Sequence, residues 1–526
     1  RSFELTLAFE RPPPEHVSHG RSFIELAPNS VTYRRAIANL DAVARMESGT
    51  DRRRRDIWFG EAAPRMETGA NGSASERLNP EQGSAWAGAL AAQDIYAIHG
   101  PPGTGKSTVL AEIMASEAKR ETTLLATASS NAAVDHLLEL ALRQGLRAVR
   151  VGHPARVSEA LQQHTLDYLI ETHHERAVVD ELRDEAYELM GYARRQRNQG
   201  RSKDRFGRAR DAKREARELL SRAEELEALV ARALLDEAQV ICATLSMLSG
   251  HVLRDRRFDL ALVDEATQAT EPLVLGAFVS ARRLVLAGDP KQLPPTVLSQ
   301  KAARAGLGQS ALERVMSIHN TDVCTMLREQ YRMNNAIMAF PSAQSYDGQL
   351  RAHSSVAERQ LPDELGAPPL LFVDTAGKGF SEERQPASSS LYNPGEGELV
   401  LGHVSRLLRD GLRGEQISVI SPYSAQVQWL RAQCEEASVE IDTIDAFQGR
   451  ENDAVLLSFV RSNDAGEVGF LSDERRLNVA LTRARKHLAM FGDSATLSSD
   501  PVYAALIEHT QSTDAYRSAW AWPESD

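Results

Sequence analysis

The sequence lacks cysteine pairs and long apolar runs, and both shortages narrow the class of protein. Its cysteines are Cys242, Cys324 and Cys434, which stand far apart and form no Cys-x-x-Cys motif. Three such cysteines exclude a full disulfide framework and favour a reducing, intracellular compartment. No apolar run approaches the roughly 18 residues that span a bilayer, so we expect no membrane partner.

A surplus of basic residues is missing as well. Lys and Arg number 61 and Asp and Glu number 73, which gives a formal net charge of −12. Net charge bears on solubility and non-specific binding rather than on fold, and by itself this value does not indicate a nucleic-acid partner. The hydrophobic share of 42% and the charged share of 25% are ordinary for a soluble globular protein and exclude a disordered or collagen-like chain.

The length of 526 residues predicts three to four domains at roughly 150 residues each. Because the chain begins with Arg1 and not with Met, we expect it to be a piece of a longer protein. Within the first 76 residues, the segments 3–9 and 23–26 alternate like strands, and residues 32–46 have a helical pattern. The predicted apolar face of that helix consists of Ile37, Leu40, Val43 and Ala44.

Short apolar strands alternate with helical stretches from Gln93 onward. Continuously apolar strands between helices indicate an α/β fold with parallel sheets that are covered by helices on both faces. There are enough strands for two such sheets. The predicted strands are 95–98, 123–126, 261–263, 284–287, 370–373, 417–420, 455–459 and 488–491.

The stretch 161–237 interrupts this alternation, because it is charged and helical and has no strand signal. Its middle, residues 194–217, is rich in Arg and Lys. Two interpretations stay open. One is a solvated antiparallel hairpin of two helices, with Gly200 at the turn, and the other is a basic arm near a phosphate backbone.

A phosphate-binding loop follows the first strand of the alternating region. The sequence GPPGTGKST fits the GxxxxGK[ST] pattern and lies between a strand and a helix, as that motif requires. Its glycines let backbone N–H groups face the β-phosphate, and the helix N-terminus adds its positive dipole end. Lys106 can reach the β- and γ-phosphates, and Ser107 can bind Mg²⁺. The predicted nucleotide-binding residues of this loop are Gly100, Pro101, Pro102, Gly103, Thr104, Gly105, Lys106, Ser107 and Thr108.

Acidic and amide side chains follow two later strands. Asp264 comes directly after an apolar strand and is placed to hold Mg²⁺, while the adjacent Glu265 is placed to polarise the attacking water. Gln292, in the sequence GDPKQLPPT, can both donate and accept hydrogen bonds at a γ-phosphate. Together with Lys106, these residues predict Mg²⁺-assisted hydrolysis of ATP.

Taken in order, these motifs resemble those of superfamily 1B helicases of the up-frameshift, immunoglobulin mu-binding and senataxin-like group. The resemblance covers about residues 76–495 and, more weakly, the N-terminal part. Its motifs are LNPEQ at 78–82, GPPGTGKST at 100–108, DEATQ at 264–268, GDPKQLPPT at 288–296, EQYRM at 329–333, SPYSAQ at 421–426, DTIDAFQGRE at 442–451 and RRLNVALTRAR at 475–485.

The resemblance implies an α/β fold with two tandem RecA-like P-loop NTPase domains. The first is expected at 77–320, with the helical insertion inside it, and the second at 321–510. Residues 1–76 would supply a partial N-terminal β-barrel and a stalk helix, and residues 511–526 a C-terminal tail.

Roles in the nucleotide site also follow from the resemblance. It implies that Gln82 reads the adenine edge, that Tyr331 stacks on adenine and that Glu451 lies near the ribose. It further implies that Arg332 and Arg483 are arginine fingers, which reach the γ-phosphate from the second domain. The residues alone leave other roles open, namely a core aromatic at 331, a structural ion pair at 332 and a solvated arginine at 483.

Contacts with a nucleic-acid backbone are implied at strand ends in both domains. The residues are Ser130, Asn131, Thr244, Pro422, Tyr423 and Thr443. The sequence departs from the family in two places: Asn334-Asn335 follows Met333 where His-Pro is usual, and Ser129 replaces a commoner proline. The first departure affects the start of the helix that follows the predicted finger Arg332.

The resemblance therefore implies an ATP-dependent helicase or translocase that uses ATP and Mg²⁺. It would act as a monomer on single-stranded RNA or DNA and move from 5′ to 3′. The alternative is an ATP-switched nucleic-acid clamp or scaffold with little unwinding. Motifs that contact the backbone do not distinguish RNA from DNA.

Overall fold

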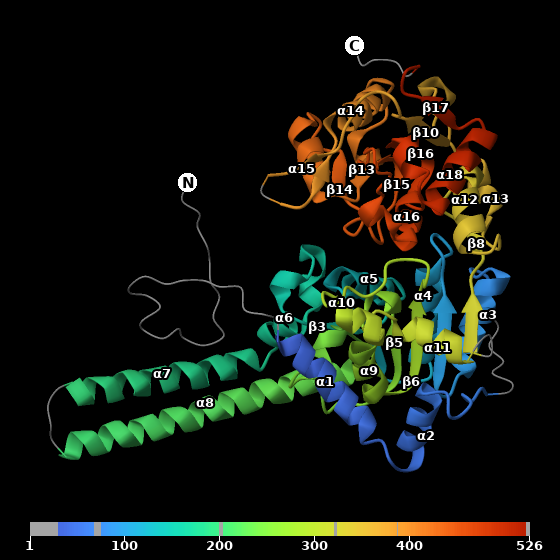
Figure 1. The fold of residues 1–526 in the computed structure, drawn as a ribbon. Helices are drawn as coiled ribbons and strands as arrows, with labels where there is room; N and C mark the ends of the chain where they lie inside the picture. Colours follow the sequence, from blue (N-terminus) through green and yellow to red (C-terminus); the bar gives the residue numbers. More distant parts are fainter. Residues whose placement is uncertain (1–29, 68–74, 199–202, 320–322, 387, 522–526) are drawn as a thin grey trace.

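The computed structural model describes residues 30–67, 75–198, 203–319, 323–386 and 388–521. They form two α/β bodies, one above the other in Figure 1, and a long helical hairpin that projects from the lower body. The strands predicted at 3–9 and 23–26, and Gly200 at the predicted turn, lie outside the described residues.

The first domain is built on a parallel sheet with the strand order β3-β4-β2-β5-β6-β1-β7. Several of its strands are buried along their whole length, as expected for a parallel sheet with helices on both faces. The strands are β1 Ile95–His99, β2 Leu124–Ala128, β3 Ala148–Val151, β4 Val240–Thr244, β5 Phe258–Val263, β6 Ala281–Gly288 and β7 Cys324–Met326. The helices of this body are α3 Pro80–Ala91, α4 Lys106–Ala118, α5 Asn131–Arg143, α9 Glu271–Ser280, α10 Gln300–Ala302 and α11 Ala311–His319.

Two further helices, α1 Ser30–Ala44 and α2 Gly49–Trp58, precede the first sheet. The prediction of which residues form the buried face of α1 is partly wrong. Val43 is buried, but Ile37 and Leu40 are 57% and 46% exposed. Asn39 takes the inner position, because its Nδ2 donates to the Pro272 carbonyl at 3.0 Å and its Oδ1 accepts from the Ser249 hydroxyl at 3.2 Å.

The charged insertion forms an antiparallel hairpin of α7 Arg176–Asn198 and α8 Lys203–Glu237, preceded by the short α6 Leu166–Glu171. Small residues let the helices approach each other, since Ala193 packs with Ala209 and Ala212. Glu227 on α8 accepts from Arg176 and Arg183 on α7 at 3.0 and 2.6 Å. The hairpin interpretation is confirmed, and a role as a basic arm stays a prediction.

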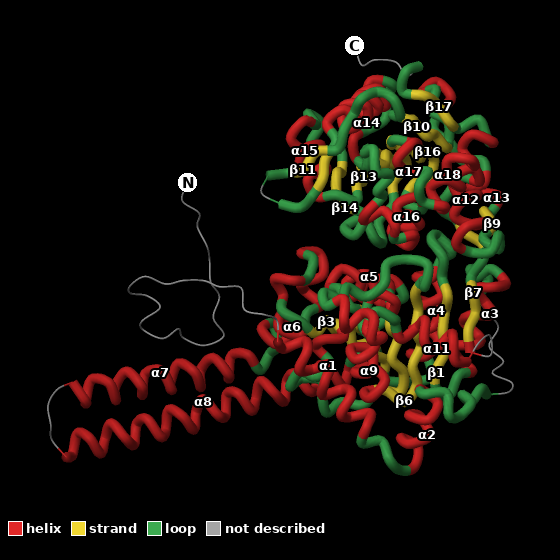
Figure 2. Tube along the Cα trace, viewed as in Figure 1, coloured by secondary structure: helices red, strands yellow, loops and turns green. Residues whose placement is uncertain are grey.

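The second domain is built on a parallel sheet with the strand order β14-β13-β15-β16-β10-β17. Neighbouring residues of its central strands enter different clusters: Phe372 and Met490 belong to one, and Val373 and Phe491 to the other. Both faces of the sheet are therefore covered, as Figure 2 shows. The strands are β10 Leu370–Asp374, β13 Ile417–Ser421, β14 Glu440–Thr443, β15 Asn452–Ser458, β16 Ala484–Gly492 and β17 Tyr516–Ser518. The helices are α12 Asn335–Ser345, α13 Ser354–Ala357, α14 Pro394–Arg409, α15 Ser424–Gln433, α16 Glu474–Leu481, α17 Ser494–Leu497 and α18 Pro501–Ser512.

Two short edge strands extend the sheets past the predicted domain limits. β7 pairs with β1 although it follows residue 320, and β17 pairs with β10 although it follows residue 510. Each has three residues and no fully buried position, so neither produces an apolar run in the sequence. Two pairs of two-residue strands, β8 Glu329–Gln330 with β9 Arg351–Ala352 and β11 Glu383–Arg384 with β12 Leu391–Tyr392, complete the described strands. Among the helices that the structure describes, none combines the length and apolar character that crossing a bilayer requires.

Candidate active site

Most of the predicted nucleotide residues line one cleft of about 720 Å³ between the two domains. The first domain contributes the loop 100–107 with Asp264, Glu265 and Gln292, which follow the carboxyl ends of parallel strands. Such ends meet at one edge of a sheet, which is where ligands bind in open α/β folds. The opposite wall is formed by Tyr331, Arg332, Glu451 and Arg483.

The phosphate-binding loop has a shape that only glycine permits at two positions. Gly103 and Gly105 have φ values of +74° and +77°, in the left-handed region. A Cβ atom on Gly103 would lie 2.6 Å from Cβ of Arg332, and one on Gly105 would collide with Nε2 of Gln82. The loop therefore allows both a turned backbone and close approach of the segment that carries Arg332.

Lys106 lies between the two predicted catalytic carboxylates. Its Nζ donates to Oε1 of Glu265 at 2.8 Å and lies 3.2 Å from Oδ1 of Asp264. Burial alone would lower the pKa of Lys106, but the two carboxylates outweigh this and raise the pKa above its ordinary value. Burial alone would raise the pKa of Glu265, but the Lys106 ammonium outweighs it and lowers that pKa. The cleft thus holds a cation and two anions in direct contact.

The turn after β5 aims Glu265 into the cleft. Glu265 has a φ of +49°, which is uncommon for a residue with a Cβ atom and is found where surrounding contacts hold the backbone. Its backbone N–H donates to Asp264 Oδ1 at 2.9 Å, and its Oε2 accepts from Gln268 at 3.0 Å. Both carboxylates are therefore held in place by neighbours within the same short segment.

Ser107 at the start of α4 and Asp264 after β5 carry oxygen donors that fit a magnesium ion. Ser107 and Asp264 offer a hydroxyl and a carboxylate oxygen, which are the hard ligands that Mg²⁺ prefers. The Ser107 hydroxyl is 3.0 Å from Nε2 of His136 on α5. His136 also lines the cleft. Sequence analysis missed it because its contact with Ser107 joins α4 and α5, which follow different strands of the sheet.

Asp289 is a second residue that sequence analysis missed, although it lies in the GDPKQLPPT segment. Its carboxylate is fully buried and accepts from Nε2 of Gln292 at 2.7 Å, from the hydroxyl of Tyr346 at 2.7 Å and from Nε2 of His99 at 3.1 Å. Burial would raise the pKa of Asp289, but donation from His99 and Gln292 lowers it, so the carboxylate is charged. Tyr346 belongs to the second domain, so the group that orients Gln292 is shared between both domains.

Asn478 on α16 extends this network. Its Nδ2 donates to the hydroxyl of Tyr346 and to the backbone carbonyl of Lys291, both at 2.8 Å. Lys291 stands directly before Gln292, and Tyr346 donates to Asp289, which holds Gln292. Both contacts of Asn478 therefore end one step away from Gln292. Hydrogen bonds from Asn478 and Tyr346 thus connect the second domain to the segment that carries Gln292.

The two predicted fingers enter the cleft from different elements. Arg483 follows α16, is almost fully buried and places Nη2 at 3.4 Å from Oε1 of Gln292. Its Nε and Nη1 donate to the carbonyls of Val479 and Arg450 at 2.9 and 3.1 Å, which fixes its direction. Burial, and then the charge of Arg332, lower the pKa of Arg483. A negatively charged group in the cleft would offset both the burial of the Arg483 charge and its repulsion by Arg332.

Arg332 stands at a turn that Gln330 shapes, because Oε1 of Gln330 accepts from the N–H groups of residues 332 and 333 at 2.8 and 2.7 Å. Its guanidinium forms an ion pair with Glu451 and donates to the Thr482 carbonyl at 3.0 Å. Arg332 therefore lines the cleft, as expected for a finger, and also forms a structural ion pair, which was the other role left open by the sequence. Glu451 also accepts from Arg485 at 2.7 Å, so two guanidinium groups hold the carboxylate that was predicted near the ribose.

The two residues predicted to contact adenine differ in exposure. The Tyr331 ring lies at the cleft, 4.7 Å from the His353 ring, and its hydroxyl donates to Glu329 at 2.8 Å. Gln82 is buried outside the cleft lining, because its Nε2 donates to the Thr104 carbonyl at 2.9 Å and its Oε1 accepts from the Asn79 N–H at 3.0 Å. Thr108 does not line the cleft either.

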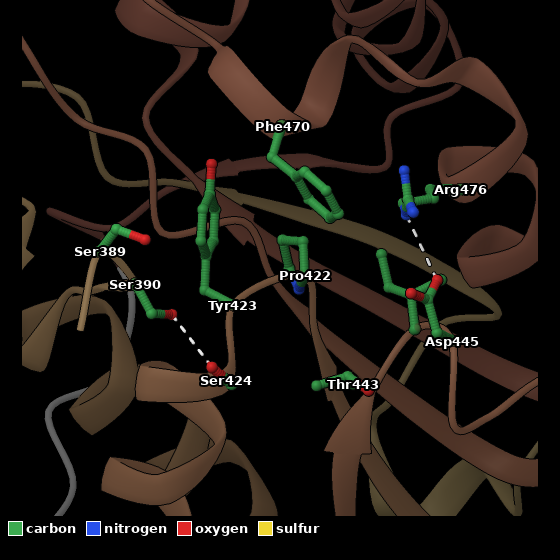
Figure 3. Close-up of a pocket in the computed structure, with 10 residues that line it drawn as sticks. Ser389, Ser390, Pro422, Tyr423, Ser424, Thr443, Asp445, Phe470 and Arg476 are labelled. Carbon is green, nitrogen blue, oxygen red and sulfur yellow. Dashed lines mark hydrogen bonds and ion pairs between the residues drawn. The ribbon is translucent and has the colours of Figure 1, made fainter. Parts of the chain in front are cut away.

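The predicted nucleic-acid residues fall into separate places. Pro422, Tyr423 and Thr443 line a second cavity of about 380 Å³ at the carboxyl ends of β13 and β14 (Figure 3). Asp445 lines both this cavity and the nucleotide cleft, so the two adjoin.

The first-domain candidates do not share that cavity. Ser130 caps α5 and lines the nucleotide cleft, and Asn131 accepts from Nη2 of Arg150 at 2.9 Å. Thr244 is buried, and its hydroxyl is 3.1 Å from that of Ser246.

The unusual Asn334 caps α12 by accepting from the Ala336 N–H at 2.7 Å, so the helix after the finger keeps a defined start.

Comparison with known proteins agrees with a division of the chain into two domains. Two protein-family profiles, both described as AAA domain, match residues 77–300 and 307–495. The chain is 33% identical to the protein named "Uncharacterized ATP-dependent helicase MJ0104" of Methanocaldococcus jannaschii, over 97% of this chain and 82% of that protein. It is 37% identical to "DNA-binding protein SMUBP-2" of Mesocricetus auratus, over 94% of this chain and 51% of that protein. It is 34% identical to "Regulator of nonsense transcripts 1" of Dictyostelium discoideum, over 82% of this chain and 32% of that protein.

The chain belongs to the superfamily 1B helicases. The predicted family and the predicted α/β fold with two tandem helicase domains are thereby confirmed. This superfamily 1B helicase chain spans about half the length of the SMUBP-2 relatives that it matches. The roles of its individual site residues stay predictions.

Proposed function

We propose that the chain is an ATP-dependent helicase or translocase that moves along single-stranded RNA or DNA. The observation that carries the proposal is the cleft in which Lys106, Asp264 and Glu265 of the first domain face Arg483 of the second. The names of two relatives support it, since one is called an ATP-dependent helicase and another a DNA-binding protein. The monomeric state and the 5′-to-3′ direction are proposed from the family resemblance, and the intracellular compartment from the three scattered cysteines.

In the proposed reaction, Lys106 binds the β- and γ-phosphates of ATP and Glu265 accepts a proton from the attacking water. Ser107 and Asp264 would hold Mg²⁺, which neutralises charge that develops on the phosphate oxygens. Arg332 and Arg483 stabilise the charge of the transferred phosphoryl group. Gln292 contacts that group, and through Asp289 and Tyr346 its position affects how the domains approach each other.

The proposal is tested by measuring ATPase and unwinding in parallel on RNA and DNA duplexes with a 5′ or a 3′ overhang. We expect single strands to stimulate ATP hydrolysis, and unwinding only of duplexes with a 5′ overhang. An ATPase rate that is indifferent to added strands would overturn the motor. Strand-stimulated hydrolysis without unwinding of any duplex would instead support the ATP-switched clamp.

Replacing Glu265 with Gln is expected to lower kcat for ATP about 10²–10⁴-fold, the usual contribution of a general base. An amide keeps the shape of the side chain but cannot accept the proton of water. Binding of ATP and of the strand should persist, so the variant should stay on a fluorescent single strand in the presence of ATP. Steady-state ATPase and fluorescence anisotropy measure the two properties. Glu139→Gln, on the outer face of α5, serves as the control and should behave like the unaltered chain.

A further inference from the structure

The cavity on the second domain contains an aromatic side chain that none of the predicted contacts includes. Phe470 lies in the short turn Gly469–Ser472 before α16, and its side chain is 46% exposed. In Figure 3 its ring stands above Pro422, between Tyr423 and Arg476. The ring of Tyr423 is 6.2 Å away, measured between centroids. An exposed aromatic inside a cavity is a surface on which a flat ligand can stack.

Arg476 covers part of this ring and is itself held in place. Its guanidinium carbon lies 4.1 Å from the centroid of the Phe470 ring. Its Nη1 donates to Asp473 at 2.6 Å, and its Nε donates to Asp445 at 3.3 Å. Because two carboxylates hold the Arg476 guanidinium before a ligand arrives, this side chain loses little freedom on binding.

The charge balance of the cavity favours a base over a phosphate. The only basic lining side chain among the described residues is Arg476, and two carboxylates already neutralise it. Apart from Asp445, which is one of those carboxylates, the remaining polar side chains of the lining carry hydroxyls, namely Ser389, Ser390, Tyr423, Ser424 and Thr443. Hydroxyls can donate to or accept from the edge of any base. The paired Arg476 guanidinium offers little uncompensated positive charge, which is what contributes most to phosphate binding.

We propose that this cavity binds one nucleobase of the single strand, stacked on Phe470 beside the Arg476 guanidinium. The proposal rests on the proposed function, since it presumes that a strand crosses the second domain near Pro422 and Thr443. It adds a base contact to the backbone contacts implied there. Stacking on an aromatic ring accepts every base, so this contact strengthens binding without selecting a sequence.

The test compares an intact single strand with an abasic strand of the same length, which keeps every phosphate and removes every base. Dissociation constants are measured by fluorescence anisotropy at one salt concentration. Phe470→Ala is expected to weaken binding of the intact strand about tenfold, in line with the usual contribution of one stacked base. Binding of the abasic strand should stay unchanged, and Phe470→Trp should retain the affinity of the original chain for both strands. Trp520→Ala, which removes a 68% exposed aromatic outside the cavity lining, should change neither affinity.

Equal losses on both strands would overturn the base contact, because a misfolded turn or a lost backbone contact does not depend on bases. If Phe470→Ala binds the intact strand as tightly as the original chain, the base contact is overturned as well. The exposed ring of Phe470 would then be a candidate contact for a protein partner. If ATP hydrolysis is still stimulated by strands in either case, the proposed function stands while the base site fails. A chain that binds neither strand would overturn both.

Discussion

Lys106→Ala is expected to reduce ATP hydrolysis below detection. The Lys106 ammonium is the charged group at the start of α4, and its contacts with Asp264 and Glu265 show that it reaches the centre of the cleft. Without it, the negative phosphates of ATP would face two carboxylates with no compensating charge from the loop. Both substrate binding and hydrolysis should therefore fail, which equilibrium binding of a fluorescent ATP analogue and a steady-state ATPase assay would show.

Loss of the fold is a separate consequence that needs its own measurement. Removing one partner of a buried ion pair costs about 3–5 kcal/mol, because the remaining charge is left uncompensated. Thermal unfolding and strand binding without nucleotide show whether the variant is folded. Lys119→Ala provides the matched control, because Lys119 follows the same helix and is exposed. A folded Lys106→Ala variant that hydrolyses ATP within tenfold of the original rate would contradict the assigned role.

Local patterns predicted most of the framework that carries these residues. The phosphate-binding loop depends on glycine spacing and on its flanking strand and helix, all within one short segment. Most inner strands are continuously apolar, so they were predicted close to their observed positions. The edge strands β7 and β17 were missed, because a strand with one neighbour and partial burial needs few apolar residues. β3, β4 and β14 were not among the predicted strands either, although β4 is a buried inner strand of the first sheet.

Contacts between distant segments were beyond reach of the sequence patterns. Nothing local indicates that Tyr346 donates to Asp289, or that His136 faces Ser107, since each pair meets only after the sheets form. The same holds for Asn39, whose polar side chain replaces the predicted apolar contacts of α1 because the backbone carbonyl of Pro272 on the distant helix α9 is within reach. Motif spacing thus predicts which residue types a site needs, and tertiary packing decides which neighbours hold them.

The acidic net charge takes on a different meaning once the sites are placed. The cleft is lined by Arg332, Arg450 and Arg483. Arg332 shares the Glu451 carboxylate with Arg485. Arg476, on the adjoining cavity, is neutralised by aspartates. Under the proposed function, this arrangement would suit a motor that must release its strand, since positive charge would be concentrated at the phosphates of ATP while the cavity proposed to hold a base would stay nearly neutral.

Arg483 should produce the second large effect. Its guanidinium points toward Gln292, while the neighbouring Arg332 shares its charge with Glu451. Buried positive charge next to another guanidinium is unfavourable until an anion arrives, and an arginine finger stabilises negative charge that develops only in the transition state. An arginine finger in related sites contributes about 10³–10⁵ in kcat, so Arg483→Gln should lower kcat by at least 10³. The KM for ATP should change much less, because ground-state binding rests on the phosphate-binding loop.

The substitution Arg483→Lys separates charge from shape. Lysine keeps the positive charge but lacks the fork that donates simultaneously to the carbonyls of Val479 and Arg450, so we expect it to restore little of the lost kcat. Arg409→Gln, on the exposed end of α14, is the control for removing one arginine from the second domain. Strand binding without nucleotide should be equal in all variants. If Arg483→Gln keeps kcat within tenfold while Arg332→Gln loses it, the finger is Arg332 alone, and Arg483 only holds Gln292 in position.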